Sequence, residues 1–311
     1  MCKDSPFTVR VPATSANIGP GFDVLGIALA MYNTCTVCPG GTKLTITVEG
    51  EGGDGEIPAD EQNLLYRALS RGMSLAGKEV PPLAIRQHNV IPASRGLGSS
   101  ASAVVAGLLA AQRLSGGTLT PEALTGLAVE MEGHPDNVLA ALRGGVVIAR
   151  RSGDSSVPLS VPLGAPLEVA LAIPDIKIST SAAREVLPQA YSLTDVVTSL
   201  QSVSLLIYSL ITGEHAYLRD AMTDRIHEPY RAPLIRGFRE AVDAALACGA
   251  LGACLSGSGS TVLAFCRGSS EAVAEAMASE FRKKGISCRA CVTSITAEGA
   301  RIIEQEGPQA Q

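Results

Sequence analysis

The chain has no tryptophan and few aromatic residues, which make up 4% of its 311 residues. Stacking on aromatic rings is therefore less important to its function than tight turns and close backbone approaches, for which 32 glycines are available. Charged residues are also few, at 18%, whereas hydrophobic residues reach 46%. A chain of this composition can bury enough apolar surface to fold, which excludes intrinsic disorder.

Positive charge is not in excess, since 25 lysines and arginines stand against 30 aspartates and glutamates. The net charge of -5 argues against a broad basic surface, so we expect neither a nucleic-acid partner nor a membrane partner. Residues 1–10 contain no apolar signal-peptide core, and no apolar run reaches the roughly 18 residues of a membrane span. These absences predict a cytoplasmic protein.

Two pairs of cysteines have the C-x-x-C spacing that zinc sites use, Cys35 with Cys38 and Cys288 with Cys291. Both pairs lie in segments with strand character, where residues i and i+3 point to opposite faces of a sheet. The eight cysteines are also dilute in a long chain without a secretory signal. Free thiols are therefore expected, rather than a zinc site or disulfides.

The length predicts two domains, at roughly 150 residues each, and the first half alternates strand and helix signals. Asn63 is expected to cap a helix whose apolar face extends from Leu64 to Leu75. The sequence Thr120-Pro121-Glu122 combines an N-cap, a proline at the first helical position and an acid, and it predicts a helix to about Met131. A markedly apolar helix is expected over residues 101–114. Strands are predicted at residues 7–11, 31–37, 44–48, 83–90 and 146–150.

Residues 151–166 are rich in serine, proline and glycine, and this shift in composition predicts the junction between the domains. We place the boundary so that the domains span residues 1–158 and 159–311. The second half has the order β, α, α, β, β, α, β, which is compatible with an α+β split βαβ arrangement of helices on an antiparallel sheet. The elements expected there are a strand at 167–173, helical segments at 194–212 and on to 248, a hairpin-like run at 250–266, a helix at 270–284 and a strand at 287–295.

The segment most indicative of function is a glycine- and serine-rich loop, which reads IPASRGLGSSA from residue 91 to residue 101. Gly96 and Gly98 allow the backbone to turn and to approach a ligand closely, and Ser99 and Ser100 add hydroxyl groups. The N–H groups and positive dipole end of the following helix suit a polyphosphate. A serine-capped helix after an ordinary loop is the alternative interpretation. The chain lacks the Walker-A, dinucleotide-binding and protein-kinase signatures.

Three segments resemble, in the same order, the motifs of the GHMP kinases, the superfamily of galactokinase, homoserine kinase, mevalonate kinase and phosphomevalonate kinase. The loop at residues 91–101 resembles their phosphate-binding motif. The segment PATSANIGPGFDVLG at residues 12–26 resembles the homoserine kinase branch, and GACLSGSGST at residues 252–261 resembles the third motif of the superfamily. Ser260 departs from the pattern, because the family more often has proline there.

The resemblance implies a two-domain α+β GHMP kinase fold, with an N-terminal ATP-binding domain similar to ribosomal protein S5 domain 2 and a C-terminal ferredoxin-like domain. It implies ATP-dependent phosphorylation of L-homoserine to O-phospho-L-homoserine in threonine biosynthesis, with Mg²⁺ and a homodimeric assembly. A mevalonate-type acceptor is one alternative, and a non-catalytic ligand-binding protein is another. The residues implied in ATP binding are Pro92, Arg95, Gly96, Leu97, Gly98, Ser99, Ser100 and Ala101.

The sequence EMEGHPDN at residues 130–137 resembles the acidic segment of the family. Mg²⁺ prefers hard oxygen ligands and keeps several waters, so one carboxylate, a serine hydroxyl and phosphate oxygens can hold it. The resemblance assigns Glu132 to the metal, together with the hydroxyl of Ser100 or Ser99. Glu130 is the alternative ligand, and a solvated helix end without a metal is the other interpretation.

An amino-acid acceptor brings an ammonium, a carboxylate and a neutral hydroxyl, so its site needs an acid, one or two arginines and an amide. The matching family positions imply Asp23 for the ammonium, and Arg184 and Arg231 for the carboxylate. Further acceptor contacts are implied at Asn17, His134, Thr180 and Gly259.

The reacting hydroxyl is expected to be oriented by Asn17 and Asn137, which are implied as catalytic residues together with Asp136. Phosphoryl transfer passes through a loose transition state, so positioning and charge neutralisation matter more than a strong base. Asp136 occupies the segment where mevalonate kinase is thought to have an aspartate base. We favour direct in-line transfer without a dedicated base, as is usually proposed for homoserine kinases.

Overall fold

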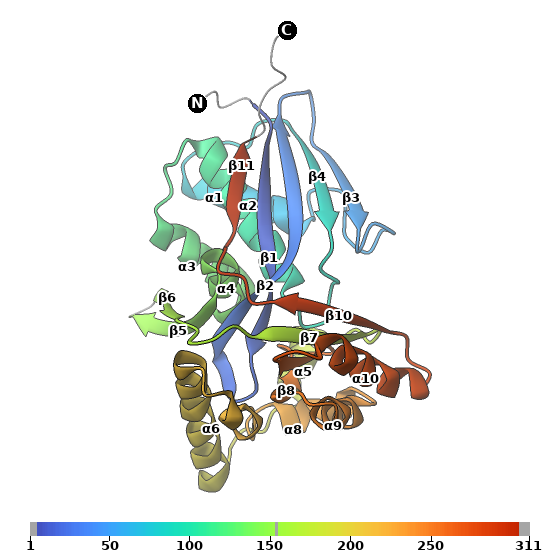
Figure 1. The fold of residues 1–311 in the computed structure, drawn as a ribbon. Helices are drawn as coiled ribbons and strands as arrows, with labels where there is room; N and C mark the ends of the chain where they lie inside the picture. Colours follow the sequence, from blue (N-terminus) through green and yellow to red (C-terminus); the bar gives the residue numbers. More distant parts are fainter. Residues whose placement is uncertain (1–4, 153–154, 305–311) are drawn as a thin grey trace.

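The structure is a computed structural model that describes residues 5–152 and 155–304. Within these residues the strands form two sheets, and the strands of the lower sheet cross below those of the upper sheet (Figure 1). The central hairpin of the upper sheet reaches down to the lower sheet. Its two strands, β1 (Phe7–Asn17) and β2 (Gly21–Pro39), lie beside each other in the middle of the upper sheet.

The upper sheet has the order β11-β1-β2-β4-β3, and β5 and β6 extend it beside the lower half of β2. Buried and half-buried residues alternate along β1 up to Arg10, whereas every residue from Val11 onwards is buried. The lower half of β1 is therefore covered on both faces. The remaining strands of this sheet are β3 (Thr45–Gly50), β4 (Leu83–Asn89), β5 (Val146–Ser152), β6 (Ser155–Val161) and β11 (Arg301–Glu304).

Four helices pack against the upper sheet, and the first two approach each other closely. The Asn63 side chain accepts a hydrogen bond from the Leu65 amide at 3.0 Å and caps the first helix, as its sequence predicts. A Cβ atom at Gly107 would lie 2.2 Å from the carbonyl oxygen of Leu65, so glycine is required at this helix contact. The helices are α1 (Leu64–Leu75), α2 (Ser99–Ser115), α3 (Pro121–Glu132) and α4 (Asp136–Arg143).

The lower sheet is antiparallel with the order β10-β7-β9-β8, which is the strand order of a split βαβ, ferredoxin-like unit. Alternate residues of β7 face different cores: Ala170 packs with the helices α9 and α10, whereas Val169 packs toward the upper sheet. The strands and these helices are β7 (Glu168–Pro174), β8 (Gly252–Leu255), β9 (Val262–Cys266), β10 (Cys288–Ser294), α9 (Phe238–Ala247) and α10 (Ser270–Lys283).

One apolar cluster joins the two sheets, because Leu25 and Leu29 of β2 pack in it together with Val169 and Phe265 of the lower sheet. The domain boundary expected between residues 158 and 159 lies inside β6, which pairs with β5 in the upper sheet. The chain also returns to the upper sheet at its end, where β11 pairs with β1. A single cut in the sequence therefore does not separate the two sheets.

Two details differ from the sequence analysis. Leu75, expected on the apolar face of α1, is 55% exposed because α1 ends there. The long helix α6 (Leu193–Thr212) has an 18-residue window of mean hydropathy 1.3, although serine and threonine interrupt its apolar residues. Within the described residues it is the one helix whose length and composition would allow a membrane span, a test that helices of soluble proteins also pass.

The cysteine pairs lie on two different strands, Cys35 and Cys38 on β2 and Cys288 and Cys291 on β10. Burial raises the pKa of the Cys35 thiol to about 12. Among the described residues, no three His, Cys, Asp or Glu side chains form a group that could hold a metal ion.

Candidate active site

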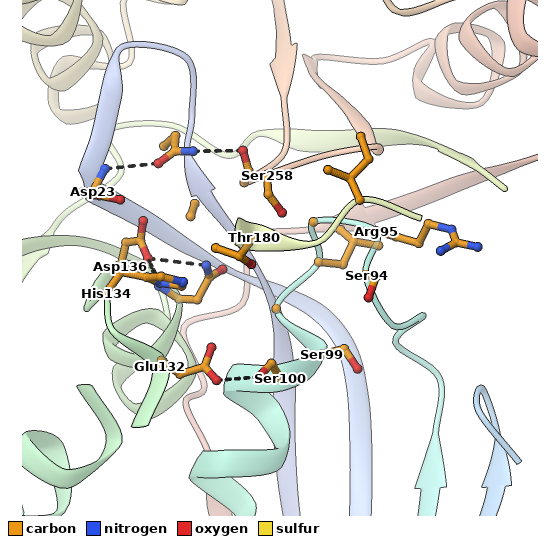
Figure 2. Close-up of a pocket in the computed structure, with 18 of the residues that line it drawn as sticks. Asp23, Ser94, Arg95, Ser99, Ser100, Glu132, His134, Asp136, Thr180 and Ser258 are labelled. Atoms are coloured by element: carbon orange, nitrogen blue, oxygen red, sulfur yellow. Dashed lines mark hydrogen bonds and ion pairs between the residues drawn. The ribbon is translucent and has the colours of Figure 1, made fainter. Parts of the chain in front are cut away.

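The three glycine-rich motifs meet at one cleft of about 130 Å³ between the two sheets (Figure 2). The buried hydroxyl of Ser256 joins them, since it lies 2.8 Å from Oγ of Ser15 and donates to the carbonyl oxygen of Gly96 at 2.6 Å. The amide of Gly257 also donates to the carbonyl oxygen of Ala16 at 3.1 Å. Segments more than 150 residues apart in the sequence are thereby held in one fixed arrangement.

The loop before α2 has a backbone path that requires glycine. Gly96 and Gly98 have φ values of +78° and +70°. A Cβ atom at Gly96 would lie 2.1 Å from the carbonyl oxygen of Ser256, and one at Gly98 would lie 1.9 Å from Oγ1 of Thr14. Gly98 is the N-cap of α2, and among the described residues no side chain caps this helix. The alternative of a serine-capped helix is therefore wrong, and the N–H groups of the first turn remain available to an anion.

A second cavity of about 320 Å³ lies on the other side of this loop, and the sequence analysis did not anticipate it. It shares Ser94, Ser99 and Ser100 with the first cleft, so the loop forms a wall of both. Its volume is in the range of small-molecule sites. The other walls come from α1, α2, residues 33–35 within β2, the end of β4 and the loop before α1, and they include Asn33, Ile57, Pro58, Asn63, Leu64 and Ala106.

The two acids at the end of α3 have different surroundings. Glu132 lines the cleft and accepts a hydrogen bond of 2.5 Å from the hydroxyl of Ser100, as Figure 2 shows. Burial raises the pKa of Glu132 above its ordinary value, although the bond from Ser100 lowers it. Glu130 is exposed and pairs with Arg71 at 2.7 Å. Of these two acids, Glu132 with its serine hydroxyl is therefore the one that offers the cleft the hard oxygen atoms that Mg²⁺ prefers.

The start of α4 orients three polar side chains toward the cleft. Oδ1 of the buried Asp136 lies 3.1 Å from Nδ1 of His134 and accepts from the amide of Asn137 at 2.7 Å. Burial lowers the pKa of His134, but the hydrogen bond and charge of Asp136 outweigh this effect and raise it. The hydroxyl of Thr14 donates to Oδ1 of Asn137 at 2.8 Å, which leaves the amide nitrogen of Asn137 facing Asp136 and the cleft.

The opposite wall of the cleft carries Asp23, Arg184 and Arg231, and the first two are already paired with each other. Arg184, on α5 (Thr180–Glu185), donates to both carboxylate oxygens of Asp23, at 2.8 and 3.1 Å. Their side chains are 39% and 36% exposed. Arg231, on α8 (Glu228–Arg231), is buried, and this burial together with the charge of Arg184 lowers its pKa to about 10.

Most of the predicted site residues therefore lie together. Pro92 and Ala101 are buried and lie outside the lining of the cleft. Gly257 and Ser258 represent the third motif at the cleft, whereas Gly259 packs toward the side chain of Ile235. The predicted residues that line the cleft are Asn17, Asp23, Arg95, Gly96, Leu97, Gly98, Ser99, Ser100, Glu132, His134, Asp136, Asn137, Thr180, Arg184 and Arg231.

Two more of these side chains, Asn17 and Arg95, also form contacts within the protein. Asn17 donates to the carbonyl oxygen of Gly257 at 3.0 Å and accepts from the amide of Asp23 at 3.2 Å. The guanidinium of Arg95 pairs with Asp175 at 2.5 Å and points away from Ser99 in Figure 2. The cleft residues that the sequence analysis missed are Ala16, Phe22, Ser94, Ile178, Gly257 and Ser258.

Comparison with known proteins agrees with this geometry. The family model of the GHMP kinases N terminal domain matches residues 63–145, and that of the GHMP kinases C terminal matches residues 206–285. The crystal structure of homoserine kinase from Cytophaga hutchinsonii is similar with a TM-score of 0.87 and 31% identity, over 97% of this chain and 99% of that chain. L. major mevalonate kinase, at 18% identity and a TM-score of 0.67, shares the fold. The fold is thus that of the GHMP kinases.

Curated relatives show to which branch of the family the chain belongs. A homoserine kinase of Moorella thermoacetica is 41% identical over 95% of this chain and 99% of its own length. One of a Synechococcus species is 42% identical over 96% of this chain and 98% of its own length. The chain belongs to the homoserine kinases of the GHMP kinase family, which confirms the identification from its motifs and the two-domain α+β fold.

Proposed function

We propose that this protein is an enzyme that transfers the γ-phosphoryl group of ATP to the side-chain hydroxyl of L-homoserine and forms O-phospho-L-homoserine in threonine biosynthesis. The observation that carries the proposal is a single cleft in which the N-terminus of α2, where no described side chain caps the helix, lies opposite an acid and two arginines. The first feature suits a polyphosphate, and the second suits a zwitterionic amino acid.

ATP binds across the glycine-rich loop in this proposal. The first-turn amides of α2 and the hydroxyls of Ser99 and Ser100 contact the phosphates, which need no cationic side chain from the loop. The nucleoside occupies the cavity of about 320 Å³, because this cavity shares both serines with the cleft.

The oxygen atoms at the end of α3 fit a divalent cation bound with the phosphates. Glu132 and Ser100 would hold Mg²⁺, since their side chains already lie 2.5 Å apart and the carboxylate is partly buried. When bound there, the ion would neutralise charge on the phosphates. Glu132 is preferred to Glu130 because the latter is exposed and paired with Arg71.

When the acceptor binds, its charged groups replace the contact between Asp23 and Arg184. Asp23 receives the ammonium group and Arg184 receives the carboxylate, so each partner of the existing pair exchanges its protein counter-charge for one from the substrate. Arg231 completes the carboxylate site. His134 and Thr180 contact the rest of the acceptor.

Transfer proceeds in line without a dedicated base. Asp136 has its Oδ1 engaged with His134 and the amide of Asn137, which suits an orienting role better than proton abstraction. Asn137 then contacts the acceptor hydroxyl through its amide nitrogen. In a loose transition state the hydroxyl proton can leave late, to an oxygen of the transferred phosphoryl group or to water, so orientation contributes more than basicity.

The test is ADP release measured with a panel of alcohols, with and without Mg²⁺. We expect turnover with L-homoserine only, and dependence on Mg²⁺. Turnover with a mevalonate-type alcohol but none with homoserine would instead establish another acceptor. Binding of ATP without ADP formation for any acceptor would establish a non-catalytic protein.

We also propose a soluble, cytoplasmic homodimer in which α6 forms the interface. Its exposed apolar residues recur at intervals of three, four or eight positions and form one stripe, so a second copy of the helix would cover them. Light scattering should give a dimer for the wild type and a monomer for Leu200→Glu, and a monomeric wild type would contradict the proposal. The stripe contains Leu193, Val197, Leu200, Tyr208 and Ile211.

A further inference from the structure

His227 is fully buried beside the acceptor half of the cleft, and each of its ring nitrogens has a hydrogen-bond partner. Nε2 lies 2.8 Å from the carbonyl oxygen of Gly19, and Nδ1 lies 3.3 Å from Nη1 of Arg231. A carbonyl oxygen can only accept, and a guanidinium can only donate. The imidazole must therefore carry its proton on Nε2 and present a lone pair to Arg231, so it is neutral.

Hydrogen bonds from the backbone amides and one stacked aromatic ring hold the imidazole in place. Oδ2 of Asp224 accepts from the amides of His227 and Glu228, at 2.8 and 2.7 Å. The ring of Phe22 stacks on the imidazole, with centroids 5.2 Å apart and planes inclined by 26°. The guanidinium of Arg231 also lies 5.1 Å from the centroid of Phe22, within the range of a cation–π contact. Neither ring of this group was among the residues expected at the site.

The hydrogen bonds of Arg231 leave one part of its guanidinium for a ligand. Nε donates to the carbonyl oxygen of Ala183 at 2.9 Å, and Nη1 donates to that of Gly257 at 3.0 Å. With the bond to His227, both hydrogens of Nη1 have acceptors. Among the described residues no hydrogen bond in the structure uses Nη2, and Arg231 lines the cleft.

We propose that His227 is a positioning residue that aligns Arg231 so that Nη2 binds the carboxylate of the acceptor. The inference rests on the proposed function, because it assigns a role within the amino-acid site of that reaction. His227 is buried behind Arg231 and does not line the cleft, so it acts through Arg231.

The charges around His227 are consistent with a neutral ring. Burial lowers the pKa of His227, and the charge of Arg231 lowers it further, whereas Asp224 and Asp23 raise it. Asp224 and Arg231 flank His227 in its own stretch of the chain, whereas Asp23 comes from β2. The neutral form is therefore the one present at neutral pH, as the hydrogen bonds require.

Two substitutions test the roles of the two ring nitrogens of His227 separately. Asparagine places a carbonyl oxygen near the position of Nδ1 and keeps an acceptor for Arg231. Glutamine places its amide near Nε2 and keeps the bond to Gly19, but Arg231 loses its acceptor. The bond that is lost is one to a charged group, so we expect His227→Gln to raise the KM for homoserine about 10- to 100-fold. The kcat and the KM for ATP should change by less than about threefold, and His227→Asn should restore most of the affinity.

Phe22→Leu removes the stacked ring without changing His227, and we expect it to raise the KM for homoserine while kcat and the KM for ATP change little. This variant provides the test if the histidine variants do not fold. A double-mutant cycle with Arg231→Lys adds a second criterion: His227→Gln should raise KM little further in that background. An unchanged KM in His227→Gln or Phe22→Leu, or equal losses in kcat and both KM values, would overturn the inference. If the wild type itself does not turn over homoserine, the proposed function fails and this inference fails with it.

Discussion

The two halves of the cleft differ in the kind of group that they offer to a charged ligand. On the proposed phosphate side, the groups offered to an anion are backbone amides and serine hydroxyls, and the arginine of the loop, Arg95, is paired with Asp175. On the acceptor side, the groups are ionised side chains, and Asp23 and Arg184 already neutralise each other. In the proposed function, the polyphosphate site therefore depends on backbone shape, whereas the amino-acid site depends on which charges are exchanged.

This contrast predicts different sensitivities. Small changes in the volume of a loop residue should damage nucleotide binding while leaving the acceptor site intact. Removal of a single charge should damage acceptor binding while leaving the fold nearly as stable, since pairs that are more than a third exposed contribute little to stability.

The largest effect is expected from Gly96→Ala. Its Cβ atom would lie 2.1 Å from the carbonyl oxygen of Ser256, so the loop must move and its amides lose their alignment. Loss of one oriented donor is worth about 10² to 10³ in rate, so we expect kcat/KM for ATP to fall about 10³-fold. Gly126→Ala in α3 is the matched control, because no atom lies within 4 Å of the added methyl. Wild-type kinetics in Gly96→Ala would contradict the shape argument.

The next effect separates the two acids of α3. Glu132→Ala should lower kcat about 10²-fold, because it removes the carboxylate to which the Ser100 hydroxyl donates. Glu130→Ala should stay within about twofold, since Glu130 is exposed. Steady-state kinetics at several Mg²⁺ concentrations measure both variants. The reverse order of effects would move the metal site to Glu130.

Asp23→Asn tests the acceptor half directly. The KM for homoserine should rise about 10- to 30-fold, as expected for the loss of a charge-assisted contact to the ammonium group, while the KM for ATP stays nearly unchanged. The melting temperature should change by only a few degrees, because the pair with Arg184 is partly exposed. Equal increases in both KM values would show instead that Asp23 supports the fold of the cleft.

The smallest effect concerns a buried acid behind the acceptor site. Burial raises the pKa of Glu228 from 4.5 to about 7. The folded protein therefore holds a proton that the unfolded chain releases, so stability falls as pH rises from about 4.5 to 7. Glu228→Gln keeps an acceptor for the amide of Leu255 and should be more stable than wild type at pH 8, on the order of 1 kcal/mol.

Urea unfolding at pH 8 and pH 5 measures this difference. The advantage of Glu228→Gln should shrink at pH 5, where wild-type Glu228 is protonated in the fold. Glu130→Gln on the surface is the control and should change stability by less than about 0.5 kcal/mol at either pH. An equal effect of Glu228→Gln at both pH values would exclude titration of the buried carboxyl as its cause.

Elements with strong local signals could be predicted from the sequence. The caps at Asn63 and Thr120 are confirmed, because both depend on side chains within three residues of the amides they bind. Helix α4 was missed, since its N-cap is Pro135 and it contains only 8 residues. Its position depends on packing against β1, β2 and β5, which no local pattern encodes.

The parts of the site that lie within sequence motifs could be predicted from the sequence. The glycine-rich loops carry a local signal, because only glycine tolerates their backbone angles and close contacts. The larger cavity depends on a loop, two helices and two strands that meet only in the fold, so no single segment indicates it. His227 was overlooked for the same reason, since its partner Gly19 lies 208 positions away in the sequence.

The apolar cluster between the sheets limits how this molecule can exchange its substrates. Two chain connections link the sheets within the described residues, at 162–167 and 295–300, and Leu25 packs against residues of the lower sheet. A clamshell opening would expose that cluster to water, at a free-energy cost proportional to the area uncovered. Entry and exit are therefore expected to depend on movements at the rim, with the halves of the protein staying in fixed orientation throughout the catalytic cycle.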